Sequence, residues 1–117
     1  MAHKFRFARP WGAPAEEPAL AAAMTNAGMN FHQQYPACGR YLDFALSRDL
    51  MKLDVEGDGE TYHRSGSGDR VSDDIRRDQA LIAGGWTVLR FWVYELREDM
   101  NRCVEKIRQT LVKLKMP

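Results

Sequence analysis

The residues best suited to chemistry are acids in the middle of the chain. Glu56 and Asp58 stand two positions apart in the run Leu50–Gly59, and Asp43 lies in the aliphatic run before it. Carboxylates that crowd together raise one another's pKa unless something positive separates them. Mg²⁺ is usually held by one or two carboxylates with substrate phosphate and water, and it can polarise a phosphodiester. We therefore expect Mg²⁺ (or Mn²⁺) at Asp43 and Glu56, with Asp58 as a further ligand.

The same pattern also has a plainer interpretation. Side chains in a strand repeat every two residues, so Lys52, Asp54, Glu56 and Asp58 would share one face, which a solvated strand also explains. The spacing of the acids alone does not distinguish a metal site from a solvated strand face. A salt bridge from Lys52 to Asp54 is expected ahead of a catalytic lysine. His63 follows the strand and would serve as a general acid or base, or lie on the surface as a lone loop histidine.

Alternating helical and strand patterns indicate the elements that must position these acids. Alanine-rich composition predicts a first helix that ends near Gly28, and Ser72 would cap a later one that stops at Gly84 and Gly85. Period-two alternation predicts the strands. The expected order is αβββαβα, a mixed α/β layered domain, with helices over 16–27, 72–83 and 95–115 and strands over 30–35, 40–46, 50–59 and 86–92.

The faces of these elements follow from the same periodicity. In the second strand Leu42, Phe44 and Leu46 would share one face, and Asp43 would project from the other. Trp86 and its neighbours are core candidates in the last strand. The final helix carries one apolar stripe at helical spacing, which is typical of packing against a sheet.

Length and composition set the remaining bounds. The chain has 117 residues, 44% of them hydrophobic, which suits one modest core, and we expect an N-terminal arm over 1–15 and a single domain over 16–117. Lys and Arg number 17 against 16 Asp and Glu, so attraction to DNA requires local clustering. Cys38 and Cys103 lie far apart, which argues against a zinc site or disulfide framework and favours a reducing, cytoplasmic location. No run is long enough for a membrane span.

Four segments, in this order, resemble the small endonucleases related to the very-short-patch-repair (Vsr) endonuclease, within the PD-(D/E)XK superfamily. The resemblance extends from about Glu17 to Ile107. The segments are Phe31–Phe44, Leu53–Gly59 with His63, Asp74–Asp78, and Gly85–Phe91.

That resemblance implies a restriction-endonuclease-like fold, a central mixed sheet flanked by helices, and a Mg²⁺-dependent phosphodiesterase site. By position, Asp43 matches the aspartate of the family's x-Asp-Phe strand, and Glu56 and Asp58 match its Glu-x-Asp-Gly. His63 matches the following histidine, and Glu17 an acid near the start of the first helix. The wider superfamily has a lysine where this chain has Asp58, so His63 would take over part of that role.

The leading hypothesis is a metal-dependent DNA endonuclease or nicking module connected with repair or restriction. Arg64, Arg70, Arg76 and Arg77 would contact phosphates, although structural salt bridges are an equal alternative for Arg76 and Arg77. A second hypothesis is a non-catalytic nucleic-acid-binding or interaction module that keeps the fold. The chain would act alone, as a homodimer, or within a larger assembly.

Overall fold

A computed structural model describes residues 16–48, 50–58, 76 and 78–115. The expected order of elements is confirmed over this part of the chain. Residues 78–83 are helical and precede the last strand. The other helices and strands, in chain order, are α1 (Glu16–Asn26), β1 (His32–Ala37), β2 (Arg40–Arg48), β3 (Met51–Asp58), β4 (Trp86–Trp92), α4 (Val93–Glu98) and α5 (Met100–Lys113).

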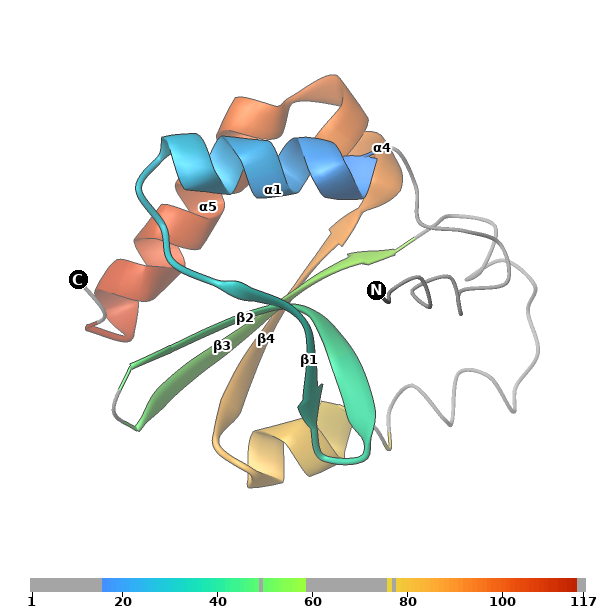
Figure 1. Cartoon of the computed structure of the whole chain (residues 1–117), viewed down its shortest axis with the longest axis vertical. Coiled ribbons are helices and arrows are strands. Elements are labelled where there is room, and N and C mark those ends of the chain that lie inside the picture. Colours follow the sequence, from blue (N-terminus) through green and yellow to red (C-terminus); the bar gives the residue numbers. More distant parts are fainter. Residues whose placement is uncertain (1–15, 49, 59–75, 77, 116–117) are drawn as a thin grey trace, which may run out of the picture.

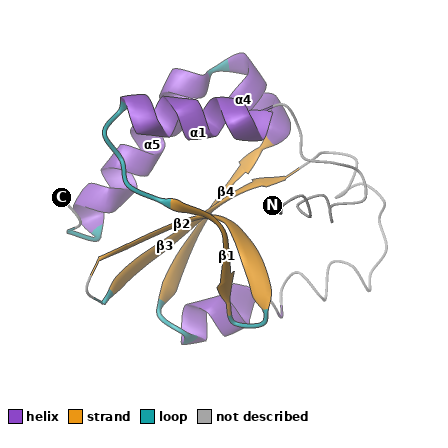
Figure 2. Cartoon of the chain, viewed as in Figure 1, coloured by secondary structure: helices purple, strands orange, loops and turns teal. Residues whose placement is uncertain are grey.

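The strands form one mixed sheet in the order β1-β2-β3-β4. Strand β2 runs antiparallel to both β1 and β3, and β4 runs parallel to β3. A parallel neighbour requires a crossover connection, and the helical residues 78–83 belong to it. Helices α1, α4 and α5 gather on one face of the sheet, and residues 78–83 lie on the other (Figures 1 and 2). This is the α/β arrangement that the sequence predicts.

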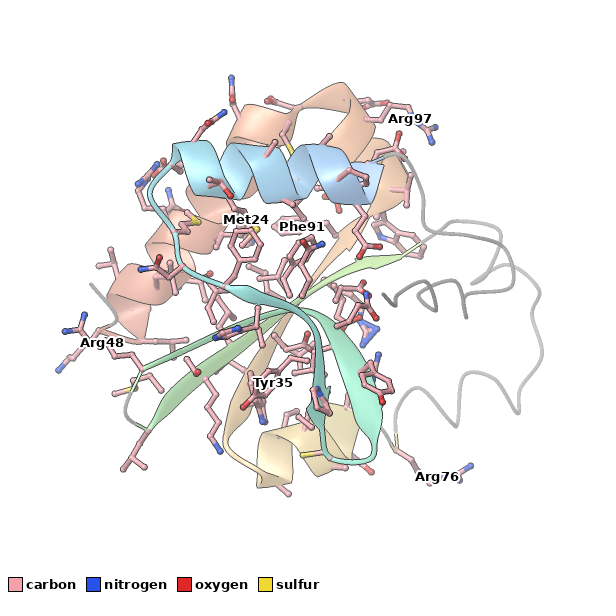
Figure 3. All side chains as sticks on the ribbon, viewed as in Figure 1. Met24, Tyr35, Arg48, Arg76, Phe91 and Arg97 are labelled. Atoms are coloured by element: carbon pink, nitrogen blue, oxygen red, sulfur yellow. The ribbon has the colours of Figure 1, made fainter. Side chains whose placement is uncertain are left out.

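The main core fills the space between the sheet and helices α1, α4 and α5. Met24 of α1 and Phe91 of β4 point into this space (Figure 3), and both are buried. Leu53 and Val55 supply the apolar face of β3, as their alternation predicts. Phe31 meets Phe44 edge to face, with ring centroids 5.5 Å apart. Burial of these side chains supplies the main free energy that holds β2 and β3 in place.

A second, smaller core lies on the opposite face. Leu42 and Ala45 of β2 pack there with Trp86 and with Leu81 of the crossover helix. Leu42 was expected beside Phe44 and Leu46, and this is wrong, because those two belong to the helix-side core. Regular alternation is therefore interrupted at Asp43, between Leu42 and Phe44. Sequence periodicity assumes a flat, regular strand and cannot detect such an interruption.

The turn between β1 and β2 is tighter than the sequence indicates. Pairing continues to Ala37 and Arg40, so only Cys38 and Gly39 remain in the turn. Both have positive φ, 51° and 82°, as a type I′ turn requires. The first strand therefore extends to Ala37 instead of ending at Tyr35. Cys38 and Cys103 are free thiols.

The single C-terminal helix expected over 95–115 is in fact two helices. Asp99 separates α4 from α5, with φ −153° and ψ 80°. Its carboxylate accepts a hydrogen bond from the backbone N–H of Arg102 at 3.1 Å, which caps the first turn of α5. An apolar stripe continues across this break, which is why periodicity alone predicts one helix.

Replacing Asp99 by alanine should lower the free energy of unfolding by about 1 kcal/mol, because the N-terminal N–H groups of α5 lose their acceptor. Urea unfolding followed by circular dichroism measures this. Asp99→Asn is the control, since asparagine caps helices about as well as aspartate. Equal stability of the alanine variant and the wild type would contradict this role of Asp99.

The expected arm over residues 1–15 and the Ser72 cap lie outside the described residues. Within the part of the chain that the structure describes, no helix is long and apolar enough to cross a membrane.

Candidate active site

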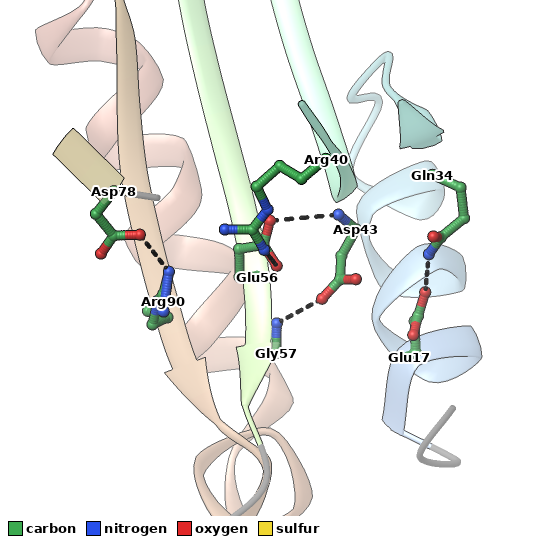
Figure 4. Close-up of polar contacts among 8 residues, drawn as sticks. All are labelled: Glu17, Gln34, Arg40, Asp43, Glu56, Gly57, Asp78 and Arg90. Atoms are coloured by element: carbon green, nitrogen blue, oxygen red, sulfur yellow. Dashed lines mark hydrogen bonds and ion pairs between the residues drawn. The ribbon is translucent and has the colours of Figure 1, made fainter. Parts of the chain in front are cut away.

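Asp43 and Glu56 lie side by side at one end of the β2–β3 pair. The antiparallel register pairs Phe44 with Val55, which brings the residues next to them together. The backbone N–H of Asp43 donates to Oε2 of Glu56 at 3.4 Å, and the N–H of Gly57 donates to Oδ2 of Asp43 at 3.1 Å (Figure 4). The two acids thus share one hydrogen-bond network across the two strands.

These acids are buried. Exposed fractions are 6% for Asp43, 4% for Glu56 and 0% for Asp54. The interpretation of this face as a solvated strand surface is therefore wrong for Asp54 and Glu56. Asp58 is the last residue of β3, and its backbone pairs with Trp92, but its side chain lies outside the description.

Burial changes the ionisation of this cluster. It raises the pKa of Glu56, and the neighbouring carboxylates of Asp43 and Asp54 raise it further. Burial also raises the pKa of Asp54, against the opposing effect of a hydrogen bond with Glu56. Within the described residues neither oxygen of Asp54 has a nitrogen or hydroxyl donor. A protonated Glu56 can act as that donor, and the raised pKa of Glu56 favours its protonated form.

Arg40 is a neighbour of the acids that sequence reasoning missed. Its Nη2 lies 3.4 Å from Oε1 of Glu56. Its Nε and Nη1 are buried and have no acceptor among the described residues. Because Arg40 begins β2 three positions before Asp43, strand alternation gives no indication that it approaches Glu56.

Lys52 does not form the expected salt bridge with Asp54. Its Nζ donates to the carbonyl oxygen of Gly84 at 3.2 Å and lies 5.7 Å from the ring centroid of Trp86. Lys52 thus ties the start of β3 to the turn before β4, and Asp54 lacks the partner that spacing suggested.

Arg90 of β4, whose role the sequence did not reveal, forms an ion pair with Asp78. Its Nη2 lies 2.7 Å from Oδ1 of Asp78, so β4 is linked to the crossover helix. Its backbone pairs with that of Glu56. Its positive charge also opposes the rise in the pKa of Asp54.

Glu17 approaches the site from α1. It lines a small pocket with Asp43 and Gly57, whose apolar walls include Leu20 and Leu96. Oε2 of Glu17 accepts a hydrogen bond from Nε2 of Gln34 at 3.2 Å. The structure therefore brings Glu17 and Asp43 to one pocket, and Glu56 bonds to the backbone of Asp43.

The donor atoms present suit a hard divalent cation. Within the described ranges, no three His, Cys, Asp or Glu side chains converge in a way that could hold a metal ion. Mg²⁺ does not require three, because it keeps several waters and is usually bound by one or two carboxylates plus phosphate. Asp43 and Glu56 supply carboxylate oxygens from adjacent strands, and oxygen is the ligand type that Mg²⁺ takes. The residues therefore fit Mg²⁺ or Mn²⁺.

Several predicted site residues lie outside the described part of the chain. These are His63, Arg64, Arg70 and Arg77. Arg76 is described, and its side chain is exposed and points away from the sheet (Figure 3). Their roles stay predictions.

A mixed four-stranded sheet between helices, with paired acids on adjacent strands, defines the restriction-endonuclease-like class. The chain belongs to one family of that class, REase_MTES_1575, whose profile matches residues 17–111.

Among known proteins, the chain is similar in sequence to a nicking enzyme and to an uncharacterized protein. The type II nicking enzyme V.NmeDIP of Neisseria meningitidis serogroup C is 30% identical over 113 residues, which cover 81% of this chain and 75% of that protein. The uncharacterized protein YcjD of Escherichia coli (strain K12) is 36% identical over 81 residues, which cover 69% of this chain and 63% of YcjD. Family and relatives together indicate a nuclease.

Proposed function

We propose that the chain is a metal-dependent DNA endonuclease, related to the Vsr enzymes, that hydrolyses phosphodiester bonds. The observation that carries this proposal is the contact between Asp43 and Glu56 on adjacent strands, both buried. Family membership and the nicking-enzyme relative support it. A cytoplasmic location, suggested by two free cysteines, would give the protein access to DNA.

The proposed role of Asp43 and Glu56 is to hold Mg²⁺ or Mn²⁺, with Asp58 as a further ligand. When bound, such an ion polarises the phosphodiester and lowers the pKa of a water molecule. The hydrogen bond from Gly57 fixes one oxygen of Asp43 and so limits the orientations of its carboxylate. Arg40 holds Glu56 in place in the metal-free protein. Glu17 of α1, which lines the same pocket as Asp43, is proposed as a further acid of the active site.

Proton transfer and DNA binding are assigned to residues beyond these. His63 is proposed as general acid or base, because histidine titrates near neutral pH. Arg64, Arg70, Arg76 and Arg77 are proposed to bind phosphates, which would make DNA binding strongly dependent on salt.

Supercoiled plasmid provides the direct test. In the presence of Mg²⁺ or Mn²⁺ the purified chain should convert it to nicked circles, and EDTA should stop the reaction. Prompt linear product would indicate that a homodimer cuts both strands. Salt-dependent binding without any cleavage would refute the catalytic proposal and favour the non-catalytic nucleic-acid-binding module.

A further inference from the structure

We infer that Gln34 is a positioning residue of the active site, whose side-chain amide orients the Glu17 carboxylate beside Asp43. The inference rests on the proposed function and deepens it. Nothing in the sequence assigned Gln34 a role. Four arguments carry it, of which three are observations on the described residues and the fourth is chemical.

The first is the backbone of Gln34, which has φ 51° although it lies within β1. Residues other than glycine, asparagine and aspartate rarely adopt this left-handed conformation, because Cβ meets the backbone. Strand pairing continues on both sides, with Gln33 opposite Phe44 and Tyr35 opposite Leu42. The distortion is therefore local to one residue, and strain of this kind tends to occur at functional sites.

The second observation is the contact that the distorted residue makes. Nε2 of Gln34 donates to Oε2 of Glu17 at 3.2 Å, and the two side chains point toward one another from β1 and α1 (Figure 4). In the register of β1 and β2, Gln34 falls opposite Asp43, because the pairs on either side are Gln33 with Phe44 and Tyr35 with Leu42. Gln34 and Glu17 thus approach Asp43 from two different elements.

The third observation is that the start of α1 is held in place by a separate contact. Oε2 of Glu16 accepts a hydrogen bond from Nε of Arg97 at 2.9 Å, which ties α1 to α4. This contact helps to hold the start of α1, from which the Glu17 side chain reaches the amide of Gln34.

The fourth is chemical. A carboxylate can be oriented by a cationic or by a neutral donor. Arg40 is cationic, and its Nη2 lies 3.4 Å from Oε1 of Glu56. An amide orients a carboxylate while leaving its full negative charge in place. A carboxylate that faces a divalent cation must keep its negative charge. Glutamine allows this, whereas lysine or arginine would compete with the cation for the carboxylate.

The test uses Gln34→Ala with Gln33→Ala as its matched control, because Gln33 is the same residue type, adjacent and exposed. Mn²⁺ affinity and single-turnover cleavage are measured for both. Gln34→Ala should lower one or both by about 10- to 100-fold, the usual effect of removing an orienting partner. Gln33→Ala should match the wild type. Equal behaviour of the two variants would overturn the inference.

A double-mutant cycle shows whether Gln34 acts through Glu17. If it does, the double variant Glu17→Ala/Gln34→Ala should lose no more Mn²⁺ affinity or cleavage than Glu17→Ala alone. Additive losses would overturn the inference. If the wild type cleaves DNA and Gln34→Ala cleaves it equally well, only this inference is refuted. If the wild type neither binds Mn²⁺ nor cleaves DNA, both the proposed function and this inference are refuted.

Stability gives a readout that needs neither metal nor DNA. Gln34→Gly relieves the left-handed strain, so we expect its Tm in EDTA to rise by about 4 °C while cleavage falls as in Gln34→Ala. A purely structural glutamine would show a lower Tm with unchanged cleavage per folded molecule, and that result would overturn the inference.

Discussion

Asp43→Asn and Glu56→Gln should each lower the rate of Mg²⁺-dependent DNA cleavage by about 10²- to 10³-fold, the loss typical when one preorganised charge is removed from a transition state. Asparagine keeps a side-chain oxygen that can still accept the N–H of Gly57, so the network of β2 and β3 survives. The lower cleavage rate then results from the lost negative charge and not from unfolding. Single-turnover cleavage of plasmid, with circular dichroism to verify the fold, measures it.

Glu105→Gln is the control for this comparison. Glu105 lies on the outer surface of α5, 55% exposed, and pairs with Arg108 in the same helix. Removing its charge should leave cleavage unchanged. If Asp43→Asn cleaves as fast as Glu105→Gln, the acids of β2 and β3 do not form the active site.

The second large effect concerns pH. The folded-state pKa values of Asp54 and Glu56 are raised by burial, so the folded protein binds these protons more tightly than the unfolded chain. Their contribution to stability is fully present below the ordinary carboxyl pKa of about 4 and is lost as pH rises toward the raised values. We therefore expect the metal-free protein to unfold at lower urea concentration at pH 8 than at pH 5.

Asp54→Asn removes one acid of the pair and supplies an amide that can donate to Glu56. At pH 8 it should be more stable than the wild type by about 1–3 kcal/mol, the range for relieving one unsatisfied buried polar group. Urea unfolding in EDTA at both pH values measures this.

Glu16 does not contribute to the expected change in stability between pH 5 and pH 8. The hydrogen bond from Arg97 lowers its pKa, so its contribution is lost only as pH falls below the ordinary carboxyl range. A wild type equally stable at pH 5 and pH 8, or an Asp54→Asn variant that is weaker at pH 8, would refute this account of the buried pair.

Much of the fold follows from local sequence patterns. Leu53 and Val55 alternate with acids, and this correctly predicts that the two aliphatic side chains share one face of β3. Gly28, with φ 79°, ends α1 where its position predicts, because only a residue without Cβ adopts that conformation easily. These predictions succeed because they depend on neighbours in the chain.

The predictions fail where contacts between segments distant in the chain determine the burial or position of a side chain. Asp54 has the spacing of a solvated residue, yet β2 and β4 on either side bury it completely. The approach of Arg40 to Glu56 depends on how the β1–β2 turn presents the start of β2. The position of Gln34 depends on the docking of α1 over the sheet. Periodicity within one strand contains none of this information.

The irregular first strand also bears on aggregation. Within the described sheet β1 is an outer strand, and a regular outer strand offers a row of unused N–H and C=O groups to other chains. Pro36 has no N–H to offer, and the left-handed turn of the backbone at Gln34 interrupts the row. The residue that we propose to orient an active-site acid therefore also makes intermolecular strand addition unfavourable, so that catalytic geometry and solubility would be selected together at this one position.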